Sequence, residues 1–383
     1  MWYLQMNAVL AMAGMIALLM VTQRWSSNKQ FGLLLFNLGF LAVYSPRLAA
    51  FMAIYTAVNY IGFRFLSRVQ QARRFWFLLC IAVNLIGVVL LRLFAMGTLH
   101  HPLFVAVITL GLIYQLLKVI DALYYAFYVG REAKASAIDY ANYILFVPTF
   151  TSGPILKFRD FMADSSKSYT VDAVTFKVNS KRIILGMFKK IVVVTWMTAL
   201  FDNVLKSPEL HVWESLILMA LFYVILYMDF SGYSDIAIGV GRLMGYQVPE
   251  NFKKPFLAPT LTQFWRSWHA TLGDWFRDHL FMPFSRQINN RWKAAGMALI
   301  IMLLMGLWHG FTWLYVFYGL YHGTVMAIEN ILQKTTVNRK KISSLYFYSR
   351  VTLTQLIVMF SVIIYSGNMD TVMRIYKGLL QMG

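Results

Sequence analysis

Apolar residues run along this chain in long blocks that are separated by short basic segments. Blocks near the length that crosses a bilayer as a helix, about 20 residues, lie at 2–23, 31–43 with 48–66, 75–97, 103–129, 183–204, 212–230, 297–317, 312–332 and 350–366. No internal repeat, low-complexity segment or linker divides them. The pattern predicts an all-α polytopic membrane protein that forms a single membrane-embedded domain over residues 1–383.

The composition supports this class. Hydrophobic residues make up 59% of the chain and charged residues only 13%, which excludes an ordinary soluble globular protein. The single cysteine, Cys80, lies in an apolar run, so no disulfide framework is possible and a packing role is expected. The segment from Met1 to Gln23 has no basic residue ahead of its apolar part, and we expect a retained span rather than a cleaved signal peptide.

The formal net charge of +19 does not predict nucleic-acid binding, because the lysines and arginines lie in short loops between apolar blocks. Cytoplasmic loops of membrane proteins carry such an excess of positive charge. Counting alternate basic loops places Met1 outside and the regions 68–74, 131–182 and 242–293 on the cytoplasmic side. An acidic partner on that side is a second explanation of the charge.

Three polar or irregular stretches interrupt the apolar pattern. The first is FVPTFTSGPILKFRDF, residues 146–161, in which Pro148 and the pair Gly153 and Pro154 cannot lie in an unbroken span. Non-helical backbone at membrane depth has to be buried in protein or line a cavity. A re-entrant turn and a loop that leaves the membrane are equally compatible with this stretch.

The second stretch is YMDFSGYSDIAIGVGRLMGYQVPENFKKPF, residues 227–256, which holds Asp229 and Asp235 among aromatic and small residues. Carboxylates at membrane depth are costly, so they should be paired or face a polar cavity. A role in holding helices together is favoured over direct catalysis. Gly241 and Gly245 form a small-xxx-small pair that permits the close approach of another helix.

The third stretch is FWRSWHATLGDWFRDHLFMPF, residues 264–284. Read as one helix, it places Trp265, His269, Leu272 and Phe276 on a single stripe. His269 is then expected on the apolar side. An isolated histidine in such a place is more often a hydrogen-bonded core residue than a catalyst.

A further stretch, MGLWHGFTWLYVFYGLYHG at residues 305–323, carries His309 and His322. Thirteen residues of ideal helix rotate by about 220°, so these two histidines can share a face only if the helix breaks between them. Both lie where backbones can approach closely, because glycines flank them at Gly306, Gly310, Gly319 and Gly323.

Other chemistries are not supported by the motifs. The histidine and carboxylate spacing matches no recognisable metal pattern, so no metal is predicted. The nucleophile motif GxSxG is absent and Cys80 has no polar neighbours in the sequence. Histidine acting as a base remains, since its ordinary pKa near 6.5 lets it accept a proton at neutral pH.

Together these stretches resemble the membrane-bound O-acyltransferase superfamily, from about Leu110 onward. The resemblance rests on DFSGYSDIAIG, on NFKKPF followed by FWRSWHATLGDWFRDHL, and on WHG followed by YGLYHG, in the order found in that superfamily. Within it, FVPTFTSGPILKFRDF is more similar to the D-alanyl transferases of teichoic acid modification, called DltB, than to alginate and peptidoglycan O-acetyltransferases.

The resemblance implies a fold and a site. The fold is a ring of about 10–11 transmembrane helices, with re-entrant and short helices, around a thin core with funnels on both faces. His309 would be the general base at the narrowest point, His269 would assist from the cytoplasmic side, and His322 would be structural. The implied substrate-binding residues are Trp265, Trp268, Asp229, Asp235 and Trp308.

The resemblance also implies the substrates. The donor would be a thioester on the phosphopantetheine arm of a small acidic carrier protein at the cytoplasmic face of a bacterial plasma membrane, with no bound cofactor. The acceptor would be a hydroxyl of an extracellular polymer, and the acyl group D-alanyl. O-acetylation of a surface polysaccharide is an alternative, and a proton-coupled transporter or flippase is another. Carrier docking is predicted at Lys253, Lys254, Arg266, Arg277, Arg286, Arg291 and Lys293.

Overall fold

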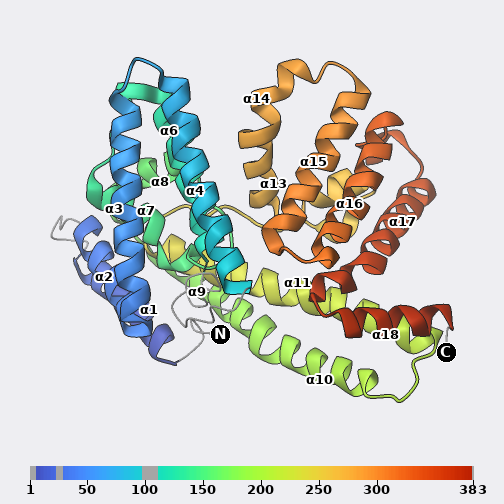
Figure 1. The fold of residues 1–383 in the computed structure, drawn as a ribbon. Coiled ribbons are helices and arrows are strands. Elements are labelled where there is room, and N and C mark those ends of the chain that lie inside the picture. Colours follow the sequence, from blue (N-terminus) through green and yellow to red (C-terminus); the bar gives the residue numbers. More distant parts are fainter. Residues whose placement is uncertain (1–5, 23–28, 97–110, 382–383) are drawn as a thin grey trace. The chain divides into compact units, whose positions relative to one another are not determined.

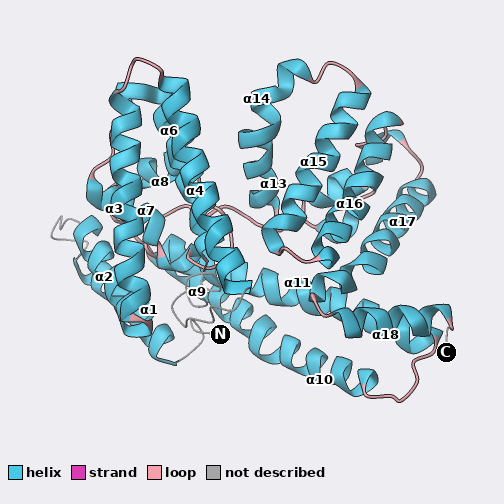
Figure 2. Ribbon diagram, viewed as in Figure 1, coloured by secondary structure: helices cyan, strands magenta, loops and turns pink. Residues whose placement is uncertain are grey.

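Helices make up the regular structure of the chain (Figure 2). A computed structural model describes residues 6–22, 29–96 and 111–381, and no β-strand occurs in these ranges. The all-α prediction is confirmed. The parts of the predicted spans at positions 2–5, 23, 97 and 103–110 lie outside the described residues.

Seven helical segments among the described residues are long and apolar enough to cross a membrane. They are Pro46–Arg68 (α3), Arg73–Phe94 (in α4, Arg73–Met96), Leu112–Glu132 (α6, Leu112–Val129, and one 3₁₀ turn), Ala173–Leu205 (α9, Ala173–Phe188, a π-helical turn, and α10, Val194–Leu205), Val212–Leu243 (α11), Arg291–His309 (α15) and Ser344–Ser366 (α17, Ser344–Val362, and one 3₁₀ turn). Two shorter apolar helices, α1 (Met6–Thr22) and α2 (Lys29–Tyr44), precede them. The polytopic class is confirmed, while the count of 10–11 spans, the ring and the funnels stay predictions.

Apolar side chains on the outside of these helices agree with a lipid environment. On α4, for example, Leu78, Val83 and Leu90 are 60%, 61% and 47% exposed. A helix with this much apolar surface facing outward is stable only where the surrounding medium is itself apolar.

Two compact units are defined by the contacts within the chain. Unit 1 comprises Met1–Ile184 with Asp235–Pro249, and unit 2 comprises Leu185–Ser234 with Glu250–Gly383. The long helices α9 and α11 each contribute residues to both units. The single-domain organisation stays a prediction.

In unit 1, α3 packs against α2, α6 and the short helix α7 (Ala137–Leu145), and α4 packs on α6 (Figure 1). Their core is aromatic. The rings of Phe161, from α8 (Phe158–Ser165), and Tyr246 stack with centroids 4.3 Å apart. Neighbouring rings that extend this cluster are Tyr140, Tyr143, Phe146 and Phe158.

The stretch 146–157, which the sequence predicts to be irregular, lies between α7 and α8 and contains only one 3₁₀ turn, Val147–Thr149. Most of its residues are buried in unit 1. Pro148 and Pro154 prevent a continuous helix here. The stretch is therefore non-helical backbone that is buried in the protein, and the re-entrant turn and the loop that leaves the membrane both stay predictions.

Polar side chains along one side of α6 satisfy this irregular backbone. Gln115 donates to the carbonyl oxygen of Phe150 at 2.6 Å, and Tyr114 donates to that of Gly153. One and two turns further along, the fully buried Lys118 donates to the last carbonyls of α7 at 3.3 and 3.4 Å, and Asp121 accepts from the first amide of α8. We refer to Tyr114, Gln115, Lys118 and Asp121 as the α6 polar row.

The small pair Gly241 and Gly245 does not serve the close helix approach that its spacing permits. Gly245 lies just beyond the end of α11 with a φ of +85°, a conformation that glycine adopts without steric cost and that ends many helices. A side chain on Gly241 would meet Val248, on the chain that folds back after this turn. The small residues therefore serve a helix end, not a helix pair.

In unit 2, α15 and α16 (Trp313–Ile331) form an antiparallel hairpin (Figure 1). The segment from His309 to His322 is not one helix, because the chain is non-helical at 310–312 between α15 and α16. The rotation of an ideal helix requires such a break if these two histidines are to share a face. A Cβ on Gly319 would lie 2.6 Å from the carbonyl oxygen of Met302 and 3.0 Å from Cα of Leu303. The predicted close approach of backbones at these glycines is confirmed.

Candidate functional site

The segment 264–284 is not one helix, so the single stripe predicted for it is wrong. Helix α12 (Leu261–Trp265) ends in a turn, and α13 begins at Ala270 and ends at Phe276. His269 lies between them with a φ of +47°, a left-handed conformation that is uncommon for a residue with a side chain. Trp265 and His269 therefore point to different neighbours.

Backbone pairing with a preceding segment explains the break. The amide of Lys253 donates to the carbonyl of Ser267 at 2.8 Å, and the amide of Ala270 donates to that of Asn251 at 2.8 Å. These two bonds hold the residues before and after His269 against the segment 251–253. They replace bonds that a continuous helix would make, and tertiary contacts of this kind are invisible to a periodicity argument.

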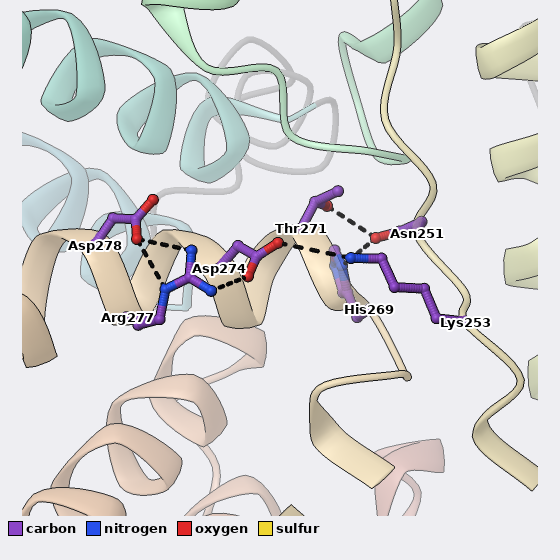
Figure 3. Close-up of polar contacts among 7 residues, drawn as sticks. All are labelled: Asn251, Lys253, His269, Thr271, Asp274, Arg277 and Asp278. Carbon is purple, nitrogen blue, oxygen red and sulfur yellow. Dashed lines mark hydrogen bonds and ion pairs between the residues drawn. The ribbon is translucent and has the colours of Figure 1, made fainter. Parts of the chain in front are cut away.

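The imidazole of His269 is 4% exposed and is held by one polar side chain. Its Nδ1 lies 3.0 Å from Oδ1 of Asn251, which also accepts from the Thr271 hydroxyl at 2.8 Å (Figure 3). Nδ2 of Asn251 lies 3.2 Å from the hydroxyl of Ser234. Asn251 has no exposed surface, so these contacts fix its amide group.

Aromatic rings surround the rest of His269. Phe230 is edge-on to it at 4.6 Å between centroids, and Trp308 at 6.1 Å. Two causes lower the pKa of the His269 imidazole to about 3. Burial is the larger, and the positive charge that His309 can carry is the smaller. His269 is therefore neutral at physiological pH.

His309 is the last residue of α15 and is partly exposed, whereas His269 and His322 are buried. Its Nδ1 lies 3.2 Å from the hydroxyl of Tyr365, whose ring is edge-on to it at 4.8 Å. The carbonyl end of a helix carries partial negative charge and stabilises a nearby cation. His309 therefore lies beside the last carbonyls of α15.

Trp308 links the two histidines within unit 2. Its ring centroid lies 4.6 Å from that of His309 and 6.1 Å from that of His269. Of the predicted substrate-binding residues, Trp308 is the one in contact with both predicted catalytic side chains.

His322 is fully buried and has a hydrogen-bond partner at each ring nitrogen. The indole N–H of Trp265 donates to Nδ1 at 3.4 Å, and the hydroxyl of Ser361 lies 2.9 Å from Nε2. Because Nδ1 accepts, Nε2 carries the proton and donates to Ser361, whose hydroxyl in turn donates to a backbone carbonyl. Such a closed network is what the predicted structural role requires.

Each predicted carboxylate is paired with a cation of the preceding helical segment. Asp229 pairs with Lys190 of the π-helical turn Lys189–Val193, in unit 2. Asp235 pairs with Arg182 of α9 at 2.9 Å, in unit 1. These contacts favour the interpretation in which the carboxylates hold helices together. The predicted substrate-binding tryptophan Trp268 instead lies in an aromatic cluster formed with Phe252, Phe264, Tyr223 and Tyr227.

The seven cations predicted for carrier docking are all exposed. Three of them have protein partners: Arg277 pairs with Asp274 at 2.7 Å and Asp278 at 2.9 Å, Lys253 approaches Asp274 at 3.9 Å, and Arg291 donates to a backbone carbonyl (Figure 3). The other four make no ion pair with any residue that the structure describes: Lys254, Arg266, Arg286 and Lys293.

Sequence reasoning missed Asn251 and Tyr365, the two partners that orient the predicted catalytic histidines. Asn251 is the first residue of the NFKKPF block, so its place within a family motif was a usable signal. Tyr365 lies in an apolar run with no such signal. A search of the described residues finds no group of three or more histidine, cysteine or acidic residues placed to hold a metal ion.

Comparison with known proteins identifies the family. The sequence model of the membrane-bound O-acyltransferase family, MBOAT, matches residues 104–368. This chain belongs to that family. It is accordingly a multi-pass membrane protein.

Named relatives fall into two groups. The chain is 30% identical to a probable alginate O-acetylase AlgI of Pseudomonas fluorescens over 344 residues, covering 87% of this chain and 67% of that protein. It is 30% identical to the corresponding protein of Azotobacter vinelandii over 253 residues, covering 66% of this chain and 49% of that protein. It is 32% identical to the teichoic acid D-alanyltransferase of Bacillus subtilis over 245 residues, covering 61% of this chain and 62% of that protein. The matches thus span between half and two thirds of these relatives.

Proposed function

We propose that this protein transfers an acyl group from a carrier-bound thioester to a hydroxyl of a cell-envelope polymer, with His309 as general base. The observation that carries the proposal is the partly exposed His309 at the carbonyl end of α15, oriented by Tyr365 and in contact through Trp308 with the buried His269. Membership of the O-acyltransferase family supports the reaction class.

The proposed chemistry needs few groups. The acceptor oxygen attacks the thioester carbonyl carbon, the carbon–sulfur bond breaks, and the hydroxyl proton passes to His309 and from there to the departing thiolate. A thioester is already activated, so the protein has to position the reactants, supply the base and exclude water. The reaction as written uses neither ATP nor a protein-bound metal.

D-alanyl is the first candidate acyl group and acetyl the second. The irregular stretch 146–161 resembles that of the D-alanyl transferases, and a teichoic acid D-alanyltransferase is among the relatives. The observation that favours acetyl is the match to an alginate O-acetylase over 87% of this chain. The acceptor would accordingly be a teichoic acid or a surface polysaccharide.

Purified protein in liposomes is expected to form D-alanyl ester on an enclosed teichoic acid acceptor when a D-alanyl carrier thioester is added outside. An acetyl donor is expected to give at most a small fraction of that product, because the two acyl groups differ by a charged ammonium. Ester is measured by mass spectrometry of the recovered polymer. Transfer of acetyl alone in this assay would exclude the D-alanyl assignment. A separate comparison uses cells that lack the protein. If their polymer keeps its ester content while the distribution of lipids or ions changes, a transporter is favoured.

The donor carrier is proposed to dock on the cytoplasmic side through exposed cations. The charges of Arg277 and Lys253 are already partly balanced by Asp274 and Asp278. The four cations without ion pairs, Lys254, Arg266, Arg286 and Lys293, should therefore contribute most to binding an acidic carrier.

Charge reversal tests this docking. Lys254→Glu and Arg266→Glu are each expected to weaken carrier binding by roughly twofold to tenfold, because exposed charge pairs contribute about 0.2–1 kcal/mol and reversal adds repulsion. Binding should also weaken with salt, since the screening length falls from about 10 Å at 0.1 M to about 3 Å at 1 M. The matched control is Lys206→Glu, an exposed lysine between α10 and α11 that the topology places outside. If the affinity for the carrier changes neither with salt nor in the Lys254→Glu and Arg266→Glu variants, the carrier does not dock on these cations.

A further inference from the structure

Asn251 makes more contacts with the His269 region than any function named so far explains. It has no exposed surface, and it contacts Ala270 through its main chain and His269 through its side chain. The Asn251 carbonyl accepts the amide of Ala270 at 2.8 Å, which holds the residue that follows the left-handed His269. Its Oδ1 lies 3.0 Å from Nδ1 of that histidine.

We propose that Asn251 is a positioning residue that keeps His269 as the Nδ1–H tautomer, so that Nε2 presents a lone pair to the substrate. Resting on the function proposed above, this makes His269 an acceptor for an N–H or O–H group of the donor, and not an acid that protonates the leaving sulfur. Nε2 of His269 makes no hydrogen bond to any residue that the structure describes.

In the structure the Asn251 amide turns Oδ1 toward His269 and Thr271 and turns Nδ2 toward the hydroxyl of Ser234. In this orientation Oδ1 accepts from His269 and from Thr271, and Nδ2 donates to Ser234 at 3.2 Å. A carbonyl oxygen has two lone pairs, so both bonds to Oδ1 can exist together. Nδ1 then carries the ring proton, because an oxygen that only accepts cannot donate to it.

Among the described residues, His309 is the one whose charge acts on His269 from its other sides. Phe230 of α11 and Trp308 of α15 are the rings that face it, and neither titrates. His309 is the titratable neighbour whose charge acts on it. Both this charge and burial disfavour protonation, so the lone pair on Nε2 persists at neutral pH.

The tautomer can be read directly from the ring nitrogens by NMR of the full-length protein in lipid, with ¹⁵N-labelled histidine and His269 assigned by a His269→Gln variant. We expect a protonated Nδ1 and an unprotonated Nε2, both unchanged between about pH 5 and 8, the range in which an unperturbed histidine titrates. A proton on Nε2 would overturn the inference. This readout does not depend on activity, so it is distinct from a failure of the proposed reaction.

Asn251→Asp is the decisive variant. A carboxylate keeps the acceptor but favours the imidazolium, so the pKa of His269 rises. Transfer should then be retained at high pH and lost as pH falls through the raised pKa, because Nε2 becomes protonated. An unchanged pH profile together with an unchanged His269 spectrum would overturn the inference.

Three further variants separate positioning from folding. Asn251→Leu removes the hydrogen-bond acceptor of His269 Nδ1. We expect kcat/KM to fall about tenfold, the effect of one lost hydrogen bond, and the NMR spectrum to show a mixture of His269 tautomers. Thr271→Val keeps the shape of the side chain and removes one hydrogen bond to Oδ1 of Asn251. It should lower kcat/KM by less, and it replaces Asn251→Leu as the test if that variant does not fold. Asn338→Asp, at an exposed cap, adds the same charge and should change neither the spectrum nor the pH profile.

Discussion

His309→Ala is expected to lower acyl transfer by about 10²–10⁴-fold, the usual contribution of a positioned general base. The side chain ends α15, is partly exposed, and has Tyr365 at Nδ1. Removing it leaves the helix and its glycine contacts intact, so insertion and carrier binding should persist. Transfer is measured with purified protein in liposomes, and carrier binding is measured on the same preparation.

Two other variants show that the effect belongs to this position. His211→Ala removes an exposed histidine before α11 and should leave transfer near its full rate. Tyr365→Phe removes the hydrogen bond to Nδ1 and should lower transfer by about fivefold to tenfold. Near-normal transfer by a well-folded His309→Ala protein would refute the assignment. Loss of carrier binding instead of transfer would make His309 a recognition residue.

Gly319→Ala should destabilise the α15 and α16 hairpin, although alanine is the better helix former. The added methyl group would lie 2.6 Å from a backbone carbonyl of α15, so the two helices must separate. Overpacking of this kind costs about 1–3 kcal/mol. Because His309 ends α15, transfer should fall together with the free energy of unfolding, measured by detergent-induced unfolding.

The matched control lies in the same hairpin. A Cβ at Gly296 of α15 meets nothing within 4 Å, so Gly296→Ala should stabilise the protein by about 0.5–1 kcal/mol through helix propensity alone. Opposite signs at the two glycines are the expected result. Equal stabilisation at both would show that the helices do not depend on this close approach.

Several elements could be predicted from the sequence because their signal is local. Apolar blocks gave the positions of α3, α4 and α17 and the first part of α11, and Pro148 with Pro154 gave the irregular stretch. The glycines around His309 and His322 predicted the close approach of backbones, though not the hairpin itself. In each case the physical cause, burial of apolar surface or a restricted backbone, acts on neighbouring residues in the chain.

Other elements could not be predicted because their cause is distant in sequence. The break at His269 depends on backbone bonds to residues 251 and 253, and the orientation of His309 depends on Tyr365. Gly245 was misread since a helix-ending glycine and a packing glycine have the same spacing. Periodicity records which face a residue takes in a helix, but not whether a neighbour ends that helix.

The α6 polar row also has a consequence for biogenesis. Backbone groups of the stretch 146–157 cannot enter hydrocarbon unpaired, and the side chains of α6 that pair with them lie 35 to 39 residues earlier in the chain. The stretch therefore cannot be inserted on its own. Translocation machinery would have to release α6 and the residues up to α8 into the bilayer together, so a polar-to-apolar change in the α6 polar row should leave the later segment exposed to quality-control proteases.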